Sequence, residues 1–172
     1  MLGSKRVGRT EGKDGLEVHS AERECLERMC DLIGGSEELL VGTVTEAVEE
    51  HGVEHMPRSV EAWRESVRGL SDAIFQAVYA HLELDGPRND PVLAYGIVRG
   101  RVQNGRGVRP EDWTALIAHY RRAYLDLIAS AGCPPEESCA CRDFLERVFD
   151  RLENGFALGC EPCSKGGRAA EG

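Results

Sequence analysis

Five of the seven cysteines lie in two clusters near the C-terminal end of the sequence. The first cluster contains Cys133, Cys139 and Cys141, and the second is the turn from Cys160 to Cys163, with sequence Cys-Glu-Pro-Cys. A Cys-x-x-Cys turn commonly forms half of a zinc or iron–sulfur site, because two intervening residues let both thiolates reach one ion. These five thiols are therefore the candidate metal ligands or redox groups.

A helix predicted between the two clusters argues against a single site built from both. At ~1.5 Å per residue, a helical segment 142–158 would hold them about 25 Å apart. A four-ligand site would then need a bend at Asn154-Gly155, ligands from Cys25 and Cys30, or a second subunit. We interpret the cysteines as structural or incidental thiols with no cofactor, and a zinc, iron–sulfur or redox site is the alternative.

The cysteine count and the absence of targeting signals favour reduced thiols. Seven is an odd number, and Cys25 and Cys30 lie about 140° apart around one predicted helix, so they cannot bridge each other. No apolar run approaches the 18 or so residues of a membrane span, and the N-terminal segment does not resemble a signal peptide. We therefore expect a cytoplasmic protein without a membrane partner.

The histidines and the catalytic motifs give no positive indication of an enzyme. His51 and His55 have the spacing of two ligands on one helix face, but Pro57 opposes a continuous helix, and we interpret them as loop side chains. His81 and His119 lie beside apolar stripes, and we interpret them as partly buried side chains rather than haem ligands. Because the sequence has no phosphate loop, nucleophile elbow or His-Glu-x-x-His motif, we expect no catalysis.

The charge distribution excludes one class of partner and suggests another. With 30 acidic and 21 basic residues, the net charge of −9 argues against nucleic-acid binding. The segment 86–122 nevertheless carries seven arginines and three acids. A glycine-containing turn in this segment is flanked by Arg99, Arg101, Arg106 and Arg109. We predict that these four form one contact face for an acidic protein partner, and a solvated rim is the alternative.

The hydrophobic pattern predicts an all-α fold of about six helices. Apolar residues recur at helical spacing in six segments, and no segment alternates with period two. We expect one domain over 15–163, with disordered tails at 1–14 and 164–172. The predicted helix from Asp90 to Gly105 contains Gly96 and Gly100, which lower its propensity, so we expect packing to hold it. Unequal helix lengths favour globin-like packing over a simple bundle.

Two C-terminal segments carry a family resemblance. Residues 90–130 read DPVLAYGIVRGRVQNGRGVRPEDWTALIAHYRRAYLDLIAS, and a later helix contains Phe149-Asp150-Arg151-Leu152-Glu153. The order is an Asp-Pro-led helix, a glycine turn, a long Leu/Arg-rich helix and a closing helix. It resembles the N-terminal sensor domain of RsbR-type stressosome proteins and of many bacterial histidine kinases, whose closing helix carries the pattern "FxDRxE"; here Phe149 directly precedes Asp150. The resemblance covers residues 59–163.

The resemblance implies a globin-like, usually haem-free domain that dimerises through its terminal helices and signals to an output domain such as a kinase. No output domain follows here, so we expect a non-enzymatic regulatory domain of the bacterial stress response that acts on a separate partner. If the last helix forms the homodimer contact, its candidate interface residues are Phe144, Val148 and Phe156. The alternative function is a helical protein that senses metal or redox state through its cysteines.

Overall fold

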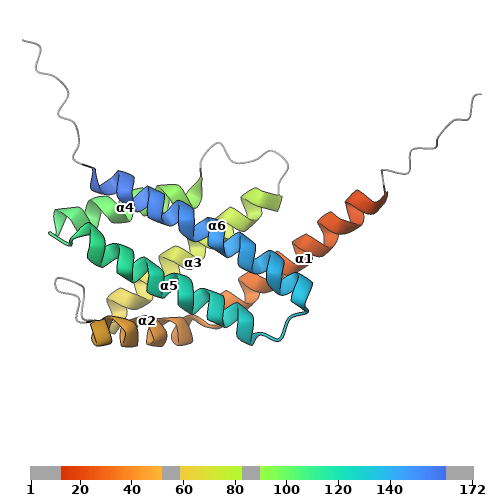
Figure 1. The fold of residues 1–172 in the computed structure, drawn as a ribbon, viewed down its shortest axis with the longest axis horizontal. Coiled ribbons are helices and arrows are strands. Elements are labelled where there is room, and N and C mark those ends of the chain that lie inside the picture. The colour runs from red at the N-terminus through yellow and green to blue at the C-terminus, as the bar shows by residue number, and fades with distance from the viewer. Residues whose placement is uncertain (1–12, 52–58, 83–89, 162–172) are drawn as a thin grey trace, which may run out of the picture.

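A computed structural model of the chain describes residues 13–51, 59–82 and 90–161, which form six α-helices and no strand. The helices are α1 (Lys13–Gly35), α2 (Glu37–His51), α3 (Val60–Leu82), α4 (Pro91–Gly105), α5 (Pro110–Ser130) and α6 (Pro135–Cys160) (Figure 1). The predicted all-α fold of about six helices is confirmed. The predicted tails fall almost wholly outside the described residues, except that α1 begins at Lys13, within the segment predicted to be disordered.

Several helix boundaries follow directly from local sequence. The Asp90 side chain caps α4 by accepting hydrogen bonds from the backbone N–H groups of Val92 and Leu93, at 3.0 and 3.1 Å. The turns after α4 and α5 contain Gly107 and Gly132, with φ of +77° and +67°. Because residues with a Cβ rarely adopt this left-handed conformation, glycine suits both turns.

Removal of the α4 cap is expected to lower stability measurably. Asp90 also pairs with Arg151 of α6, at 3.4 Å between Oδ2 and Nε. The variant Asp90→Ala should therefore lose about 1 kcal/mol of the free energy of unfolding, which urea denaturation measures. Asp126→Ala is the matched control, because Asp126 forms only an exposed i,i+4 pair with Arg122, and it should change stability by less than about 0.5 kcal/mol. Equal losses in both variants would contradict this role of the cap.

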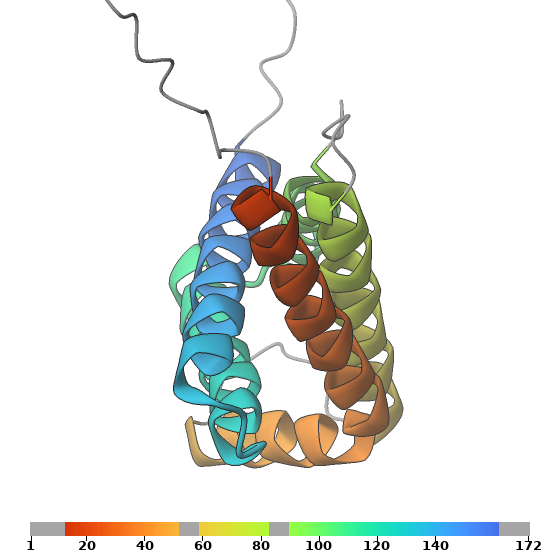
Figure 2. The ribbon, with the colours of Figure 1, turned by 90° about the vertical axis from the view of Figure 1, so that its right-hand side faces the viewer.

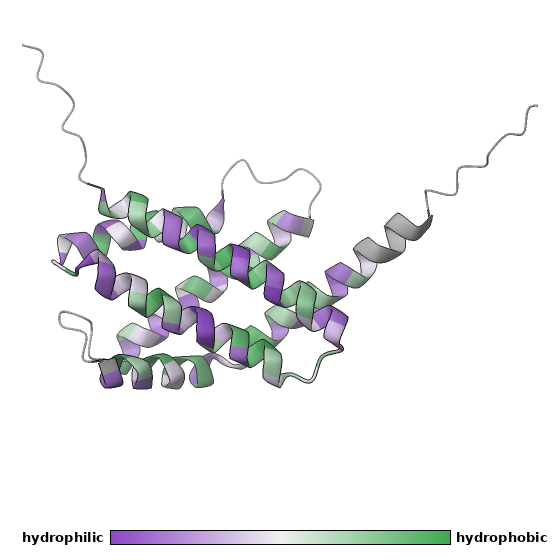
Figure 3. Cartoon of the chain, viewed as in Figure 1, coloured by the Kyte–Doolittle hydropathy of each residue, from purple (hydrophilic) through white to green (hydrophobic). Residues whose placement is uncertain are grey.

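The helices pack around one apolar core. α6 lies alongside α4 and α5, and α3 packs against α1, α2 and α4. Figure 2 shows α2 running crosswise below the other helices. Each helix carries a hydrophobic and a hydrophilic side, as the colouring in Figure 3 shows, and the hydrophobic sides supply the buried residues. No helix in the described ranges is long and apolar enough to cross a membrane.

Glycines bring α4 and α6 into backbone contact. Gly96 lies against Gly155, and Gly100 lies against Gly159, so the two helices run parallel with matched four-residue spacings. A Cβ at Gly96 would lie 2.6 Å from the carbonyl oxygen of Leu152, and one at Gly100 would clash with the carbonyl oxygen of Phe156. The packing that was expected to hold α4 is thus this contact with α6. Only glycine lets the two helix backbones approach so closely.

The candidate interface residues of α6 lie in the protomer's own core. Phe144, Val148 and Phe156 are 6%, 2% and 3% exposed, and Phe156 stacks on Trp113 with ring centroids 4.9 Å apart. The prediction that placed them at a subunit interface is therefore corrected, because these side chains are fully used by intramolecular packing. The large apolar side chains that α4 and α6 do expose are Val98, Val102 and Leu158.

The charged residues of the "FxDRxE" segment link three helices. Arg121 of α5 donates to Glu146, Asp150 and Glu153 of α6 at 2.9–3.0 Å. Since Arg151 pairs with the cap residue Asp90, the segment ties α6 to both α4 and α5. Its charged residues thus have a structural role in this chain.

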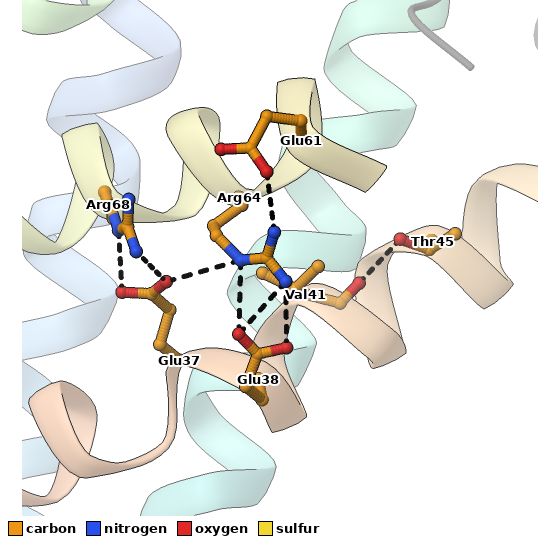
Figure 4. Close-up of polar contacts among 7 residues, drawn as sticks. All are labelled: Glu37, Glu38, Val41, Thr45, Glu61, Arg64 and Arg68. Atoms are coloured by element: carbon orange, nitrogen blue, oxygen red, sulfur yellow. Dashed lines mark hydrogen bonds and ion pairs between the residues drawn. The ribbon is translucent and has the colours of Figure 1, made fainter. Parts of the chain in front are cut away.

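A second charged network joins α2 to α3. Arg64 of α3 contacts Glu37, Glu38 and Glu61, and Arg68 contacts Glu37 at 2.9 Å (Figure 4). The hydrogen bond from Arg64 lowers the pKa of Glu38, whose carboxylate is thus favoured in its charged form. This network fixes the start of the crosswise helix α2 against α3.

Candidate functional site

Two buried cysteines, one from the first helix and one from the last, meet in the core. The Sγ atoms of Cys25 in α1 and Cys141 in α6 are 2.7 Å apart, and each residue is 4% exposed. The Cys25 thiol also contacts the carbonyl oxygen of Glu137 at 3.2 Å. The Cys141 thiol contacts the carbonyl oxygen of Cys25 at 3.6 Å. We call these two residues the thiol pair.

Helical spacing explains why the thiol pair forms. In α1, Cys25 and Met29 are four apart and both are buried, so Cys25 belongs to the face that packs on the core. In α6, Cys141, Leu145 and Val148 form the corresponding buried stripe. Contact between α1 and α6 then places the two sulfur atoms opposite each other.

The surroundings keep the Cys141 thiol protonated. Burial raises the pKa of Cys141 well above its usual value, and the neighbouring Cys25 raises it further. Cys30, on another face of α1, has a pKa raised to about 11 by burial and by the charges of Asp31 and Glu27. Because thiolates are the reactive and metal-binding form, neutral pH leaves these two residues mainly as thiols.

A small pocket leads to the thiol pair. Its volume is about 140 Å³ and its lining is predominantly apolar. The lining residues are Cys25, Arg28, Met29, Leu32, Ile128, Ala131, Cys133, Glu137 and Cys141. Arg28 and Glu137 form an ion pair at 2.6 Å, and Cys133 is half-buried. The pocket thus brings three thiols to one space with room for a small molecule.

Of the five predicted metal-ligating cysteines, the structure brings two together and places two others away from them. Cys133 and Cys141 line the same pocket, whereas Cys139 is exposed and Cys160 lies near the carbonyl oxygen of Gly100, 3.7 Å away. The helix α6 runs unbroken through Asn154-Gly155, so it holds Cys139 and Cys160 about 30 Å apart. Cys163 lies outside the described residues. Within the described ranges, no group of three or more His, Cys, Asp or Glu side chains is placed to hold a metal ion.

Cys25 is the residue of the thiol pair that the metal-site prediction left out. It entered that prediction only as a possible extra ligand together with Cys30, and it lies 116 positions from Cys141 in the sequence. The sequence feature that could have identified Cys25 is its position in the apolar stripe of α1, because a buried cysteine in that stripe must face another helix.

The four arginines predicted to form one contact face do not share a face. Arg99 is half-buried, with its guanidinium 5.8 Å from the centre of the Trp113 ring. Arg101 is exposed on α4, because two residues turn a helix by about 200°. Arg106 is also exposed, and Arg109 forms two hydrogen bonds of 2.8 Å to Asp112 in the first turn of α5. The prediction of one face for all four is therefore corrected, because Arg99 and Arg101 lie on different sides of α4; Arg101, Arg106 and Arg109 are exposed.

Of the histidines, His81 has a defined surface contact. Its Nε2 atom lies 3.0 Å from Oε1 of Glu22, and its ring meets Phe144 edge-on with centroids 5.5 Å apart. His119 is half-buried on α5, which agrees with its interpretation as a partly buried side chain. The side chains of His51 and His55 lie outside the description.

Comparison with known proteins identifies no relative. No family model, curated protein or solved structure matches the chain. The functional argument therefore depends on the residues and their geometry.

Proposed function

We propose that the chain is a non-enzymatic regulatory domain whose signal is the oxidation state of the Cys25–Cys141 thiol pair. The observation that carries the proposal is the 2.7 Å separation of the two Sγ atoms. A disulfide needs about 2.05 Å, so bond formation requires the sulfur atoms to approach by less than about 1 Å.

The reaction removes two electrons and two protons from the thiol pair. With hydrogen peroxide as the oxidant, two thiols and one peroxide give one disulfide and two molecules of water. The pocket beside the pair admits an oxidant of this size. Because the Cys141 thiol is largely protonated at neutral pH, oxidation should accelerate as pH rises and the thiolate fraction grows.

The output of this reaction is a covalent link between α1 and α6. The reduced state holds these helices together by packing alone, whereas the oxidised state fixes their separation at this level of the core. A partner that contacts either helix would then distinguish the two states. The homodimer and the separate signalling partner implied by the resemblance stay predictions.

Peptide mapping after oxidation tests the proposal. Protein treated with hydrogen peroxide and digested without reductant should yield a peptide pair joined through Cys25 and Cys141. The control variant Cys139→Ser should give the same pair, because Cys139 is exposed and outside the pocket. Cys141→Ser should abolish it. Intact Cys25 and Cys141 thiols after oxidation of the exposed cysteines would contradict the proposal.

A further inference from the structure

A row of polar side chains on α4 faces α3 and α5. Tyr95, Arg99 and Gln103 are four residues apart and therefore share one face of the helix. Gln103 has 0% exposure, and the other two are half-buried. The Tyr95 hydroxyl donates to the carbonyl oxygen of Ser66 on α3 at 3.1 Å, and Arg99 Nη2 lies 3.5 Å from Ser66 Oγ. This row is separate from the thiol pair and from the glycine contact with α6.

Two aromatic residues of α5 extend the polar cluster. Trp113 and Tyr120 are buried, and their Nε1 and hydroxyl groups have no hydrogen-bond partner in the described part of the chain. Burial raises the pKa of Tyr120, and the Ser66 side chain, which lies near the hydroxyl without reaching hydrogen-bond geometry, opposes this shift only in part. The Tyr120 phenol is therefore neutral and keeps a proton that it can donate.

The cluster contains five buried polar atoms without partners. They are Arg99 Nε, Gln103 Nε2 and Oε1, Trp113 Nε1 and Tyr120 Oη. Native proteins rarely leave buried polar groups unpaired, because each has given up its hydrogen bonds to water. Four of these five atoms carry a hydrogen for donation, so the cluster has a surplus of donors.

The positive charge of Arg99 indicates that the missing hydrogen-bond partner is negatively charged. Within the described ranges, Arg99 forms no ion pair, although the neighbouring Arg109 and Arg121 both do. Its guanidinium is held against the face of Trp113, where part of the charge is removed from water. An anion would satisfy both this charge and the surplus of donors.

We propose that Arg99, Gln103, Trp113 and Tyr120 bind a small, singly charged anion of the carboxylate class. The planar fork of an arginine matches the two oxygen atoms of a carboxylate, and the amide, indole and phenol groups supply further donors. A phosphate is a poorer fit, because one cation would leave its second charge buried without compensation. Because Gln103 is 0% exposed, its amide can meet only a guest enclosed by the protein, and formate, the smallest carboxylate, is therefore the probe.

Titration of the full chain with sodium formate tests this proposal. Formate replaces chloride at constant ionic strength, while the melting temperature is recorded. We expect a saturable increase in melting temperature, since a ligand that binds only the folded state stabilises it. Arg99→Gln should weaken formate binding about tenfold or more, because it removes a charged hydrogen bond.

The matched control is Arg101→Gln, which removes the same charge from an exposed position of α4. It should leave formate binding unchanged. Tyr120→Phe gives an independent check, because it removes only the unpaired hydroxyl and preserves the core. This variant should bind formate several-fold more weakly than the wild type. Its melting temperature without formate should not fall. Equal effects of formate and chloride on the wild type, or equal weakening by Arg99→Gln and Arg101→Gln, would overturn the proposal.

Discussion

The variant Gly100→Ala is expected to lose about 3 kcal/mol of the free energy of unfolding. The new Cβ would meet the carbonyl oxygen of Phe156 and the backbone of Gly159. Because both obstacles are backbone atoms of an adjacent helix, the strain cannot be relieved by a change of rotamer. The helical propensity gained from alanine, about 1 kcal/mol, offsets only part of this cost. Urea denaturation followed by circular dichroism measures the loss.

Gly42→Ala is the matched control for this prediction. Gly42 also lies within a helix, but no heavy atom of a neighbour lies within 4 Å of the position that its Cβ would occupy. The propensity gain should therefore appear without strain, as an increase of about 0.5–1 kcal/mol in the free energy of unfolding. The two substitutions should have opposite signs, and a stabilising effect of Gly100→Ala would contradict the close packing of α4 on α6.

Oxidation of the thiol pair is expected to raise the free energy of unfolding by about 4 kcal/mol. The bonded residues are 116 positions apart, so a disulfide would restrict most of the unfolded chain. Such a long closed loop lowers the entropy of the unfolded state. The measurement is urea denaturation of the same preparation with and without reductant.

The double variant Cys25→Ser, Cys141→Ser is the control for the effect of oxidation. Its free energy of unfolding should be the same with and without reductant, whereas Cys139→Ser should behave like the wild type. A wild-type protein whose stability does not depend on reductant, despite a disulfide confirmed by peptide mapping, would show that the bond strains the folded state.

The helices were predictable because their signals are local. Asp90 followed by Pro91 marks the start of α4, and the apolar stripe of α5 gives its buried face without knowledge of any other segment. Arg99 and Arg101 were wrongly placed together, although helical geometry alone separates residues two apart. The helical repeat alone therefore predicts that Arg99 and Arg101 lie on different sides of α4.

Other features depend on contacts between distant segments. From the sequence alone, Gly96 and Gly100 indicate only a loss of helix propensity. Their role in close helix packing depends on Gly155 and Gly159, which lie opposite them in α6. The same holds for Cys25, whose partner is 116 positions away. The burial of Phe144 could not be separated from an interface role, because an apolar stripe does not reveal whether it packs within one chain or between two.

The contact between α1 and α6 also determines how the molecule would respond to mechanical force. These are the first and last helices, and they meet at Cys25 and Cys141. If α1 is pulled away from the rest of the molecule, its contact with α6 at these two residues is one of the contacts that resist the force. In the reduced state the contact would yield by separation of the helices. Once the sulfur atoms are bonded, the covalent path runs directly from residue 25 to residue 141, so pulling on the two ends cannot extend the backbone of α2, α3, α4 and α5.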